Sequence, residues 1–281
     1  MPPEGDGKRI EPGALYVVST PIGNLEDITL RALRVLREAD VVAAEDTRHT
    51  QILLRAHGIE RRLVSYHEHN ETQRSRELLE ELGSGRSVAV VSDAGTPGVS
   101  DPAYRIVRAA IDAGLRVVPV PGASAVLTAL ILAGFPSGGF VSAGFLPLKG
   151  RARQDAIERI LVDQRPTVFF ESPRRAARTL AEFAARAPER SAALLREMTK
   201  MHEEARRGTL RLLAEQAAGD PPRGEVVVVI AGAPRETPEL DLSPAARAER
   251  DRLVAGGLEE DEATRRVIEI YGAGRRRKGG R

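Results

Sequence analysis

Short apolar runs and amphipathic stretches alternate along the first half of the chain. The apolar runs, at residues 15–18, 41–44, 63–65, 87–91 and 116–120, are rich in valine, as is typical of buried strands. Between them, apolar residues three or four positions apart predict helices at residues 27–38, 50–57 and 71–82, with Asp27 as the cap of the first. This alternation predicts a mainly parallel sheet with helices on both faces.

A second set of elements follows a Gly/Pro-rich break at residues 134–139. An apolar helix at residues 123–133 precedes the break. Beyond it we expect strands at residues 140–143, 167–170, 192–195, about 203–207 and 225–230, and helices at 152–162, 174–185 and 209–217. Several connections are short, so this sheet can mix parallel and antiparallel strands. The pattern therefore predicts two α/β domains, residues 14–136 and 137–233.

The remaining residues, 234–281, read as a linker, two short helices and a basic tail. The helices are expected at residues 244–255, with Ser243 as cap, and 261–271, and a Gly256-Gly257 turn joins them. Such a pair is either a helix-turn-helix-like element or a packing appendage, and the sequence leaves both open. The tail at residues 274–281 would add affinity for phosphate.

Composition narrows the class of protein. The 281-residue chain has no cysteine, which excludes a disulfide scaffold, a thiolate zinc site and a cysteine nucleophile. Its net charge is only +2, and its 4% aromatic content argues against an RNA platform built on base stacking. The first residues are polar, and no apolar run approaches the ~18 residues that span a bilayer. We therefore expect a cytoplasmic protein with no membrane segment.

Three loops of small residues and prolines follow predicted strands, at residues 19–24, 92–102 and 119–125. The carboxyl ends of parallel strands are where open α/β sheets place ligands, so these loops predict a shared cleft. The loops match no familiar nucleotide site. A G-x-x-x-x-G-K-[ST] motif is absent, and no G-x-G-x-x-G follows the first strand, which disfavours a P-loop NTPase and a dinucleotide-binding site.

Longer motifs carry a more specific signal. They are LYVVSTPIGNLEDIT at residues 15–29, AEDTR at 44–48, the loop at 92–102, FESPRR at 170–175, and REMTK at 196–200 followed by Glu203. With these motifs in this order, the chain resembles the ribosomal RNA small subunit methyltransferase I family, within the tetrapyrrole-methylase superfamily. The resemblance covers roughly residues 14–232 and the C-terminal helices.

The resemblance implies 2′-O-methylation of a cytidine ribose in the decoding region of small-subunit (16S) ribosomal RNA, with S-adenosyl-L-methionine as methyl donor. It also implies a cofactor cleft between two α/β domains, and a homodimer. The positions that match the superfamily's cofactor-binding residues are Pro21, Ala94, Gly95, Thr96, Val99, Ser124, Ala125, Glu171 and Met198. Relatives that act on tetrapyrroles carry Gly-Asp-Pro where this chain has Gly95-Thr96-Pro97, which argues against a tetrapyrrole substrate.

Methyl transfer from a sulfonium is an in-line displacement with a neutral leaving group, so alignment matters most and no metal is needed. A neutral ribose hydroxyl is a poor nucleophile, and a base or a nearby cation would help. Among Glu45, Asp46, Arg48 and Lys200, we take Glu45 as base or orienter, and Arg48 or Lys200 as a contact to phosphate or hydroxyl. The alternative for residues 45–48 is a helix cap with a local ion pair.

Two further groups of residues suggest other chemistry. The run His67-Glu68-His69 invites a metal site, but the sequence indicates no third ligand, so we expect none. Several cations either form a phosphate-binding surface or lie on solvated helix faces: Lys149, Arg151, Arg153, Arg174, Arg175, Arg206 and Arg207.

Small-subunit ribosomal RNA, recognised as folded RNA, is the expected partner. Two alternatives stay open. One keeps the fold but methylates a tetrapyrrole or a protein side chain, and the other is a non-catalytic ribosome-assembly factor.

Overall fold

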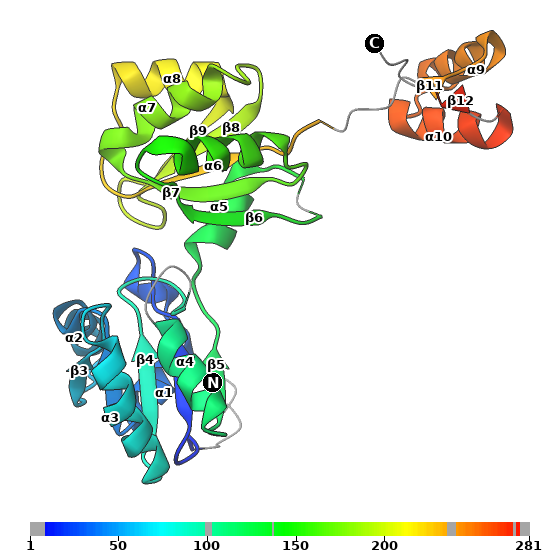
Figure 1. Ribbon diagram of the computed structural model, residues 1–281. Coiled ribbons are helices and arrows are strands. Elements are labelled where there is room, and N and C mark those ends of the chain that lie inside the picture. Colours follow the sequence, from blue (N-terminus) through cyan, green and yellow to red (C-terminus); the bar gives the residue numbers. More distant parts are fainter. Residues whose placement is uncertain (1–8, 99–102, 137, 235–239, 272–273, 276–281) are drawn as a thin grey trace. The chain divides into compact units, whose positions relative to one another are not determined.

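In the computed structural model of the chain, the first α/β region forms a parallel sheet (Figure 1). The structure describes residues 9–98, 103–136, 138–234, 240–271 and 274–275. The strand order is β3-β2-β4-β1-β5, with β1 (Leu15–Val18), β2 (Val41–Ala44), β3 (Leu63–Ser65), β4 (Val88–Val91) and β5 (Val117–Val120). All neighbouring strands are parallel, so their carboxyl ends meet at one edge. The predicted parallel sheet is confirmed.

Helices cover both faces of this sheet because successive strand residues point to opposite sides. Val42 and Ala89 pack with the helices at residues 30–38 and 47–56 on one face, whereas Val41 and Val88 pack with those at 71–83 and 103–112 on the other. The helical elements of this region are the short 3₁₀ helix η1 (Leu25–Asp27), α1 (Leu30–Glu38), α2 (Thr47–Ala56), α3 (Glu71–Gly83) and α4 (Ala103–Asp112).

The helix starts differ from the sequence prediction in three places. Asp27 belongs to η1 and does not cap α1, because Thr29 Oγ1 accepts the hydrogen bond from Ala32 N at 3.0 Å. Helix α2 begins three residues earlier than predicted, after the cap Asp46. Helix α4 was not predicted, although Ile106 and Ala110 have the spacing of a buried helix face.

The second sheet mixes both strand orientations, as the short connections predicted. Its order is β6-β7-β10-β8-β9, in which β6 and β7 are parallel and the other neighbours antiparallel. The strands are β6 (Val141–Phe145), β7 (Thr167–Glu171), β8 (Ser191–Arg196), β9 (Glu204–Thr209) and β10 (Val226–Ile230). Helices α6 (Gly150–Val162), α7 (Pro173–Ala184) and α8 (Leu210–Gly219) pack on one face.

The apolar helix α5 (Ala125–Ala133) covers the opposite face of this second sheet. Its Val126 and Leu130 pack against Val168 and Val229. Helix α5 thus precedes the sequence break but adds to the core of the strands that follow it. Residues 1–233 form one compact unit, and the division at residue 136 stays a prediction.

The second unit, residues 234–281, contains a helical hairpin. Its helices are α9 (Pro244–Ala255) and α10 (Glu260–Tyr271), within one residue of the predicted bounds, and β11 (Leu240–Asp241) pairs with β12 (Gly274–Arg275). Ser243 caps α9, as predicted, by accepting a hydrogen bond from Ala246 N at 3.2 Å. Most of the predicted basic tail, residues 276–281, lies outside the described residues.

Phe183 provides a test of the larger core, because its fully buried ring stacks on Phe169 with ring centroids 5.6 Å apart. We expect Phe183→Ala to lower the free energy of unfolding by about 3–5 kcal/mol, since it removes buried apolar area and leaves a cavity. Urea unfolding followed by circular dichroism measures the change. Ile111→Ala, at a position 54% exposed on α4, should change it by no more than about 0.5 kcal/mol. Equal effects of the two substitutions would contradict this account.

Candidate active site

The three small-residue loops interlock at the carboxyl edge of the parallel sheet. Thr20 and Gly95 exchange two backbone hydrogen bonds, of 2.9 and 3.1 Å. Ser19 Oγ lies 3.0 Å from Thr96 Oγ1, and a Cβ on Gly122 would meet Ser19 Cβ at 2.9 Å. The loops after β1, β4 and β5 therefore form one structure, as predicted.

Two neighbouring cavities open beside these loops. The first cavity, about 400 Å³, has mostly apolar walls that include Ala125, Phe170 and Met198. The second cavity, about 320 Å³, has a mixed lining that includes Pro21, Leu25, His49, Ile52, Asp93 and Lys200. Ile22, Ala94 and Glu225 line both cavities. Ligand groups bound in the two cavities would therefore lie next to each other, on either side of the wall that these three residues form.

Lys200, which lines the second cavity, lies on a conformationally constrained turn after β8. Glu197 and Thr199 have φ of 49° and 67°, a region that costs energy for residues other than glycine. Contacts offset that cost, since Glu197 Oε1 accepts hydrogen bonds from Glu225 N at 2.9 Å and Lys200 Nζ at 3.0 Å. Strained backbone that is fixed in this way is common at functional sites.

Lys200 is held as an ammonium ion. Its side chain is 28% exposed, and Nζ lies 3.0 Å from Glu197 Oε1 and 3.3 Å from Glu225 Oε2. Burial lowers the pKa of Lys200, but the hydrogen bond to Glu197 and the charge of Glu225 outweigh burial, so its pKa lies above the ordinary value. A lysine that stays protonated at neutral pH serves as a cation and not as a general base.

Gly23 brings the loop after β1 against this turn. A Cβ at position 23 would lie 2.6 Å from Lys200 Cγ, 2.7 Å from Thr199 Oγ1 and 2.9 Å from the Met198 carbonyl oxygen. These distances are too short for any side chain. The close approach sets the position of Lys200 relative to the first loop.

Comparison with known proteins identifies the family. Residues 14–214 match the family model described as Tetrapyrrole (Corrin/Porphyrin) Methylases. A ribosomal RNA small subunit methyltransferase I from Mesorhizobium japonicum is 48% identical in an alignment of 274 residues that covers 93% of this chain and 93% of the relative. One from Haemophilus influenzae is 43% identical over 263 residues, covering 92% of this chain and 93% of the relative. The chain belongs to the ribosomal RNA small subunit methyltransferase I family.

A solved structure shares the fold of this family member. The uroporphyrin-III-C-methyltransferase from Thermus thermophilus aligns with a TM-score of 0.56 and 25% identity, over 77% of this chain and 94% of that chain. The predicted tetrapyrrole-methylase type of fold is therefore confirmed.

The predicted cofactor residues of this methyltransferase-family chain lie in and around the two cavities. Ala94, Ala125, Glu171 and Met198 line the first cavity, and Pro21 lines the second. Three others support the loops, because Gly95 pairs with Thr20, Thr96 contacts Ser19, and Ser124 Oγ caps α5 by accepting from Leu127 N at 3.4 Å. Val99 lies outside the described residues. The cofactor assignments themselves stay predictions.

Glu171 lines the first cavity with a fully buried carboxylate that is already bonded on both oxygens. Oε1 accepts from Ser172 N at 2.7 Å and lies 2.6 Å from Arg175 NH2, while Oε2 accepts from Thr179 Oγ1 at 2.6 Å. The buried Arg153 donates to the same Thr179 at 2.8 Å. This network fixes β7 against α6 and α7, so Glu171 shapes the wall of the first cavity.

The three predicted catalytic residues do not all line the same cavity. Lys200 lines the second cavity, whereas Glu45 and Arg48 are not among its lining residues. The side chain of Arg48 is 91% exposed and pairs with Asp46 at 3.4 Å, and Asp46 caps α2 by accepting from Arg48 N at 2.8 Å. The cap with a local ion pair, weighed as the alternative for this motif, is thus present. Glu45 instead accepts a hydrogen bond from Asp93 N at 3.4 Å.

Sequence reasoning missed His49 and Asp93 as site residues. Both line the second cavity, and His49 Nδ1 lies 3.9 Å from Asp93 Oδ2. Asp93 belongs to the loop at residues 92–102, which the sequence predicts to contribute to a ligand cleft. Asp93 could therefore have been predicted from that loop. His49 carries no motif and is found only through the fold.

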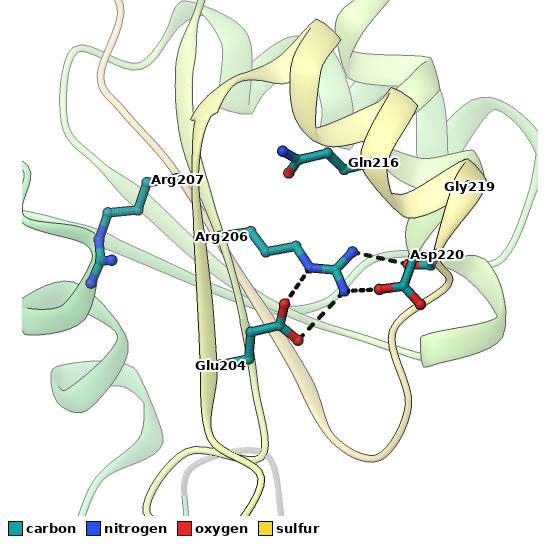
Figure 2. A pocket seen from close by; sticks show the side chains of 6 residues that line it. All are labelled: Glu204, Arg206, Arg207, Gln216, Gly219 and Asp220. Carbon is teal, nitrogen blue, oxygen red and sulfur yellow. Dashed lines mark hydrogen bonds and ion pairs between the residues drawn. The ribbon is translucent and has the colours of Figure 1, made fainter.

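Most of the arginines proposed as a phosphate-binding surface form hydrogen bonds or ion pairs within the protein. Figure 2 shows Arg206 between Glu204 and Asp220, to which it donates at 2.7 Å and 2.5 Å, and Arg207 pointing away from them. Arg207 donates to the Leu132 carbonyl oxygen at 2.7 Å, near the end of α5. With Arg153 and Arg175 in the network of Glu171, these four arginines have structural partners. Arg151 has a longer contact, 3.9 Å to Asp155, and its side chain is 94% exposed, so its contact to phosphate stays a prediction.

The structure bears on two of the other sequence expectations. Within the described residues, no three histidine, aspartate or glutamate side chains gather as metal ligands, and His67 contacts His69 and Asn70. No helix in the described part of the chain is both long and apolar enough to cross a bilayer.

Gly23→Ala tests the close approach that positions Lys200. The new Cβ must displace the turn at residues 198–200, so we expect methyl transfer to fall at least about tenfold, since misplacing a positioned group by 1 Å can cost a hundredfold. Labelled-methyl transfer to small ribosomal subunits measures the rate, and the melting temperature reports on folding. Gly83→Ala is the matched control, because a Cβ there meets nothing within 4 Å. Full activity of Gly23→Ala would show that the turn accommodates a side chain.

Proposed function

We propose that the chain transfers the methyl group of S-adenosyl-L-methionine to the ribose 2′-hydroxyl of a cytidine in the decoding region of small-subunit (16S) ribosomal RNA. The observation that carries this proposal is the pair of cavities with a shared wall at Ile22, Ala94 and Glu225. In-line transfer needs the donor sulfur, the methyl carbon and the acceptor oxygen in one row. Two adjoining cavities are suited to hold donor and acceptor in that way.

The first cavity suits the donor. Ala125, Phe170 and Met198 present apolar surface that can pack on an adenine ring and a methyl group. Bound there, the donor would supply an electrophilic methyl group on a positively charged sulfur, with a neutral thioether as the leaving group. The interlocked loops hold Ala94 in the wall of the first cavity. Its side chain is a single methyl group, so it leaves room for the donor.

The second cavity suits the acceptor nucleoside. Lys200 lies on the turn against Gly23 and next to Glu225, and Glu225 lines both cavities. Its ammonium group can donate a hydrogen bond to the ribose oxygen and thereby favour loss of the hydroxyl proton, which passes to solvent water. Lys200 thus keeps the hydroxyl-contact role expected from the sequence, and its raised pKa argues against a role as the base. Glu45 acts as an orienter through Asp93 N.

We also propose that two copies associate, as the family resemblance implies, and that the protein works in the cytoplasm on the assembled subunit. Helix α5 supports the dimer, because its apolar side chains Leu127 and Ile131 are 52% and 80% exposed. Such apolar residues favour burial in an interface.

The reaction is tested by labelled-methyl transfer. The protein is incubated with labelled S-adenosylmethionine and small ribosomal subunits that lack its modification, and the RNA is then digested to nucleosides. We expect the label in 2′-O-methylcytidine, because the second cavity presents a ribose hydroxyl to the donor. Label in the base, or none despite measured cofactor binding, would overturn the proposal. Failure to bind the cofactor would favour an assembly factor instead.

Lys200→Met tests the cation. We expect the rate constant for methyl transfer to fall roughly a hundredfold, as when one positioned hydrogen-bond donor is lost from a transition state, with donor affinity nearly unchanged. Single-turnover transfer and calorimetric titration of the donor separate the two effects. Arg108→Met is the control, since it removes a surface cation of α4 that pairs only with Asp112 among the described acids. An unchanged rate in Lys200→Met would exclude the cation from the reaction.

A further inference from the structure

We propose that Asp93 selects cytidine over uridine by accepting a hydrogen bond from the exocyclic amino group of the acceptor base. This inference rests on the proposed function, because it names the base that accompanies the methylated ribose. It assigns a specificity role to a side chain of the second cavity that methyl transfer itself does not use.

Among the described residues, one oxygen of the Asp93 carboxylate accepts a hydrogen bond and the other does not. Oδ1 accepts a hydrogen bond from Asp46 N at 2.9 Å, and Asp93 N donates to Glu45 Oε2 at 3.4 Å. Within the described residues, Oδ2 has no hydrogen bond, and its ion-pair contact to His49 Nδ1 measures 3.9 Å, beyond hydrogen-bond distance. The side chain is 37% exposed at the second cavity. Among the described residues, Asp93 thus carries one acceptor oxygen with no hydrogen bond, on a side chain that lines the second cavity.

Asp93 and Lys200 contact the second cavity from different elements. Lys200 lies on the turn after β8 and is tied to Glu225, which belongs to the wall shared with the first cavity. The Asp93 carboxylate is instead directed at the start of α2, where it meets Asp46 and His49. A nucleoside whose ribose lies at Lys200 would then point its base toward α2.

The surroundings of Asp93 fit a base that is out of its stack. Leu25 and Ile52 line the same cavity and are 41% and 60% exposed, so apolar side chains are available to cover the faces of a pyrimidine ring. Enzymes that modify a base commonly extrude it and recognise its Watson–Crick edge by hydrogen bonds, and the same kind of recognition can apply to a base whose ribose is modified. Asp93 offers one such bond at that edge.

The chemistry of the carboxylate decides between the two pyrimidines. An ionised aspartate only accepts hydrogen bonds, and the N4 amino group of cytosine donates, which makes it a common partner of Asp and Glu. Uridine carries the O4 acceptor at the same position, so two acceptors would face each other. One good base contact discriminates by about ten- to a hundredfold, which is the expected preference of the wild-type protein.

Asp93→Asn exchanges a single atom of this arrangement. The amide oxygen can keep the hydrogen bond from Asp46 N, while an NH₂ group replaces Oδ2 and turns the acceptor into a donor. We expect the ratio of kcat/KM for cytidine over uridine to fall at least about tenfold, with faster methylation of uridine than in the wild type. The substrates are small ribosomal subunits carrying cytidine or uridine at the acceptor position, and the methylated nucleoside is identified after digestion.

Asp112→Asn is the matched control. It makes the same chemical change on the surface of α4, where Asp112 pairs with Arg108, and the cytidine-to-uridine ratio should stay at the wild-type value. An Asp93→Asn protein that loses activity on both substrates equally, with the ratio unchanged, would overturn the inference and leave the proposed function intact. A wild-type protein that methylates neither substrate would overturn the proposed function and this inference with it.

A second test needs no variant. Subunits that carry a pyrimidin-2-one riboside at the acceptor position lack the amino group but keep the ribose. We expect wild-type kcat/KM on this substrate to fall about tenfold or more relative to cytidine, while donor affinity stays constant. Equal rates on the two substrates would show that the amino group is not recognised.

Discussion

The close approach of Gly23 to the turn at residues 198–200 is the constraint on which the site depends. No side chain fits at position 23, where a Cβ would lie within 3 Å of three separate atoms. The contact joins the loop after the first strand of one sheet to the turn after β8 of the other. Both cavities lie along this contact, because Ile22 precedes Gly23 and lines them both. A larger residue at 23 would open the shared wall.

Hydrogen bonds and ion pairs within the protein fix the charged groups near this contact. Lys200 is held between two carboxylates, and the backbone of Asp93 is bonded to Glu45 while its Oδ1 is bonded to Asp46 N. Groups fixed in advance need little reorganisation during the reaction, which is the main source of electrostatic catalysis. The positive φ angles of Glu197 and Thr199 show the conformational cost of holding Lys200 in this way.

The sequence predicted the elements of the fold better than the neighbours of each side chain. Apolar runs located the strands because parallel strands are buried on both faces. Helix α4 was missed because no element was assigned to residues 103–112, between the loop at 92–102 and the strand at 116–120, although Ile106 and Ala110 have helical spacing. The proximity of Asp93 to α2 was not predictable, since it depends on β4 lying beside β2 although β3 stands between them in the chain. Arg206 and Arg153 likewise donate to Asp220 and Thr179, which lie outside their own elements, so basic composition alone overstated the phosphate-binding surface.

The charges of the second cavity also determine which part of an RNA can enter it. Asp93 and Glu225 line the cavity with carboxylates, and Lys200 is already paired with two acids. Such a lining repels a phosphate but accepts an uncharged ribose and base. Phosphate contacts, which provide most of the affinity for nucleic acid without reading its sequence, must then lie outside the cavity. Because affinity and base selection come from separate places, a substitution inside the cavity can change the preferred nucleotide without loosening the complex with RNA.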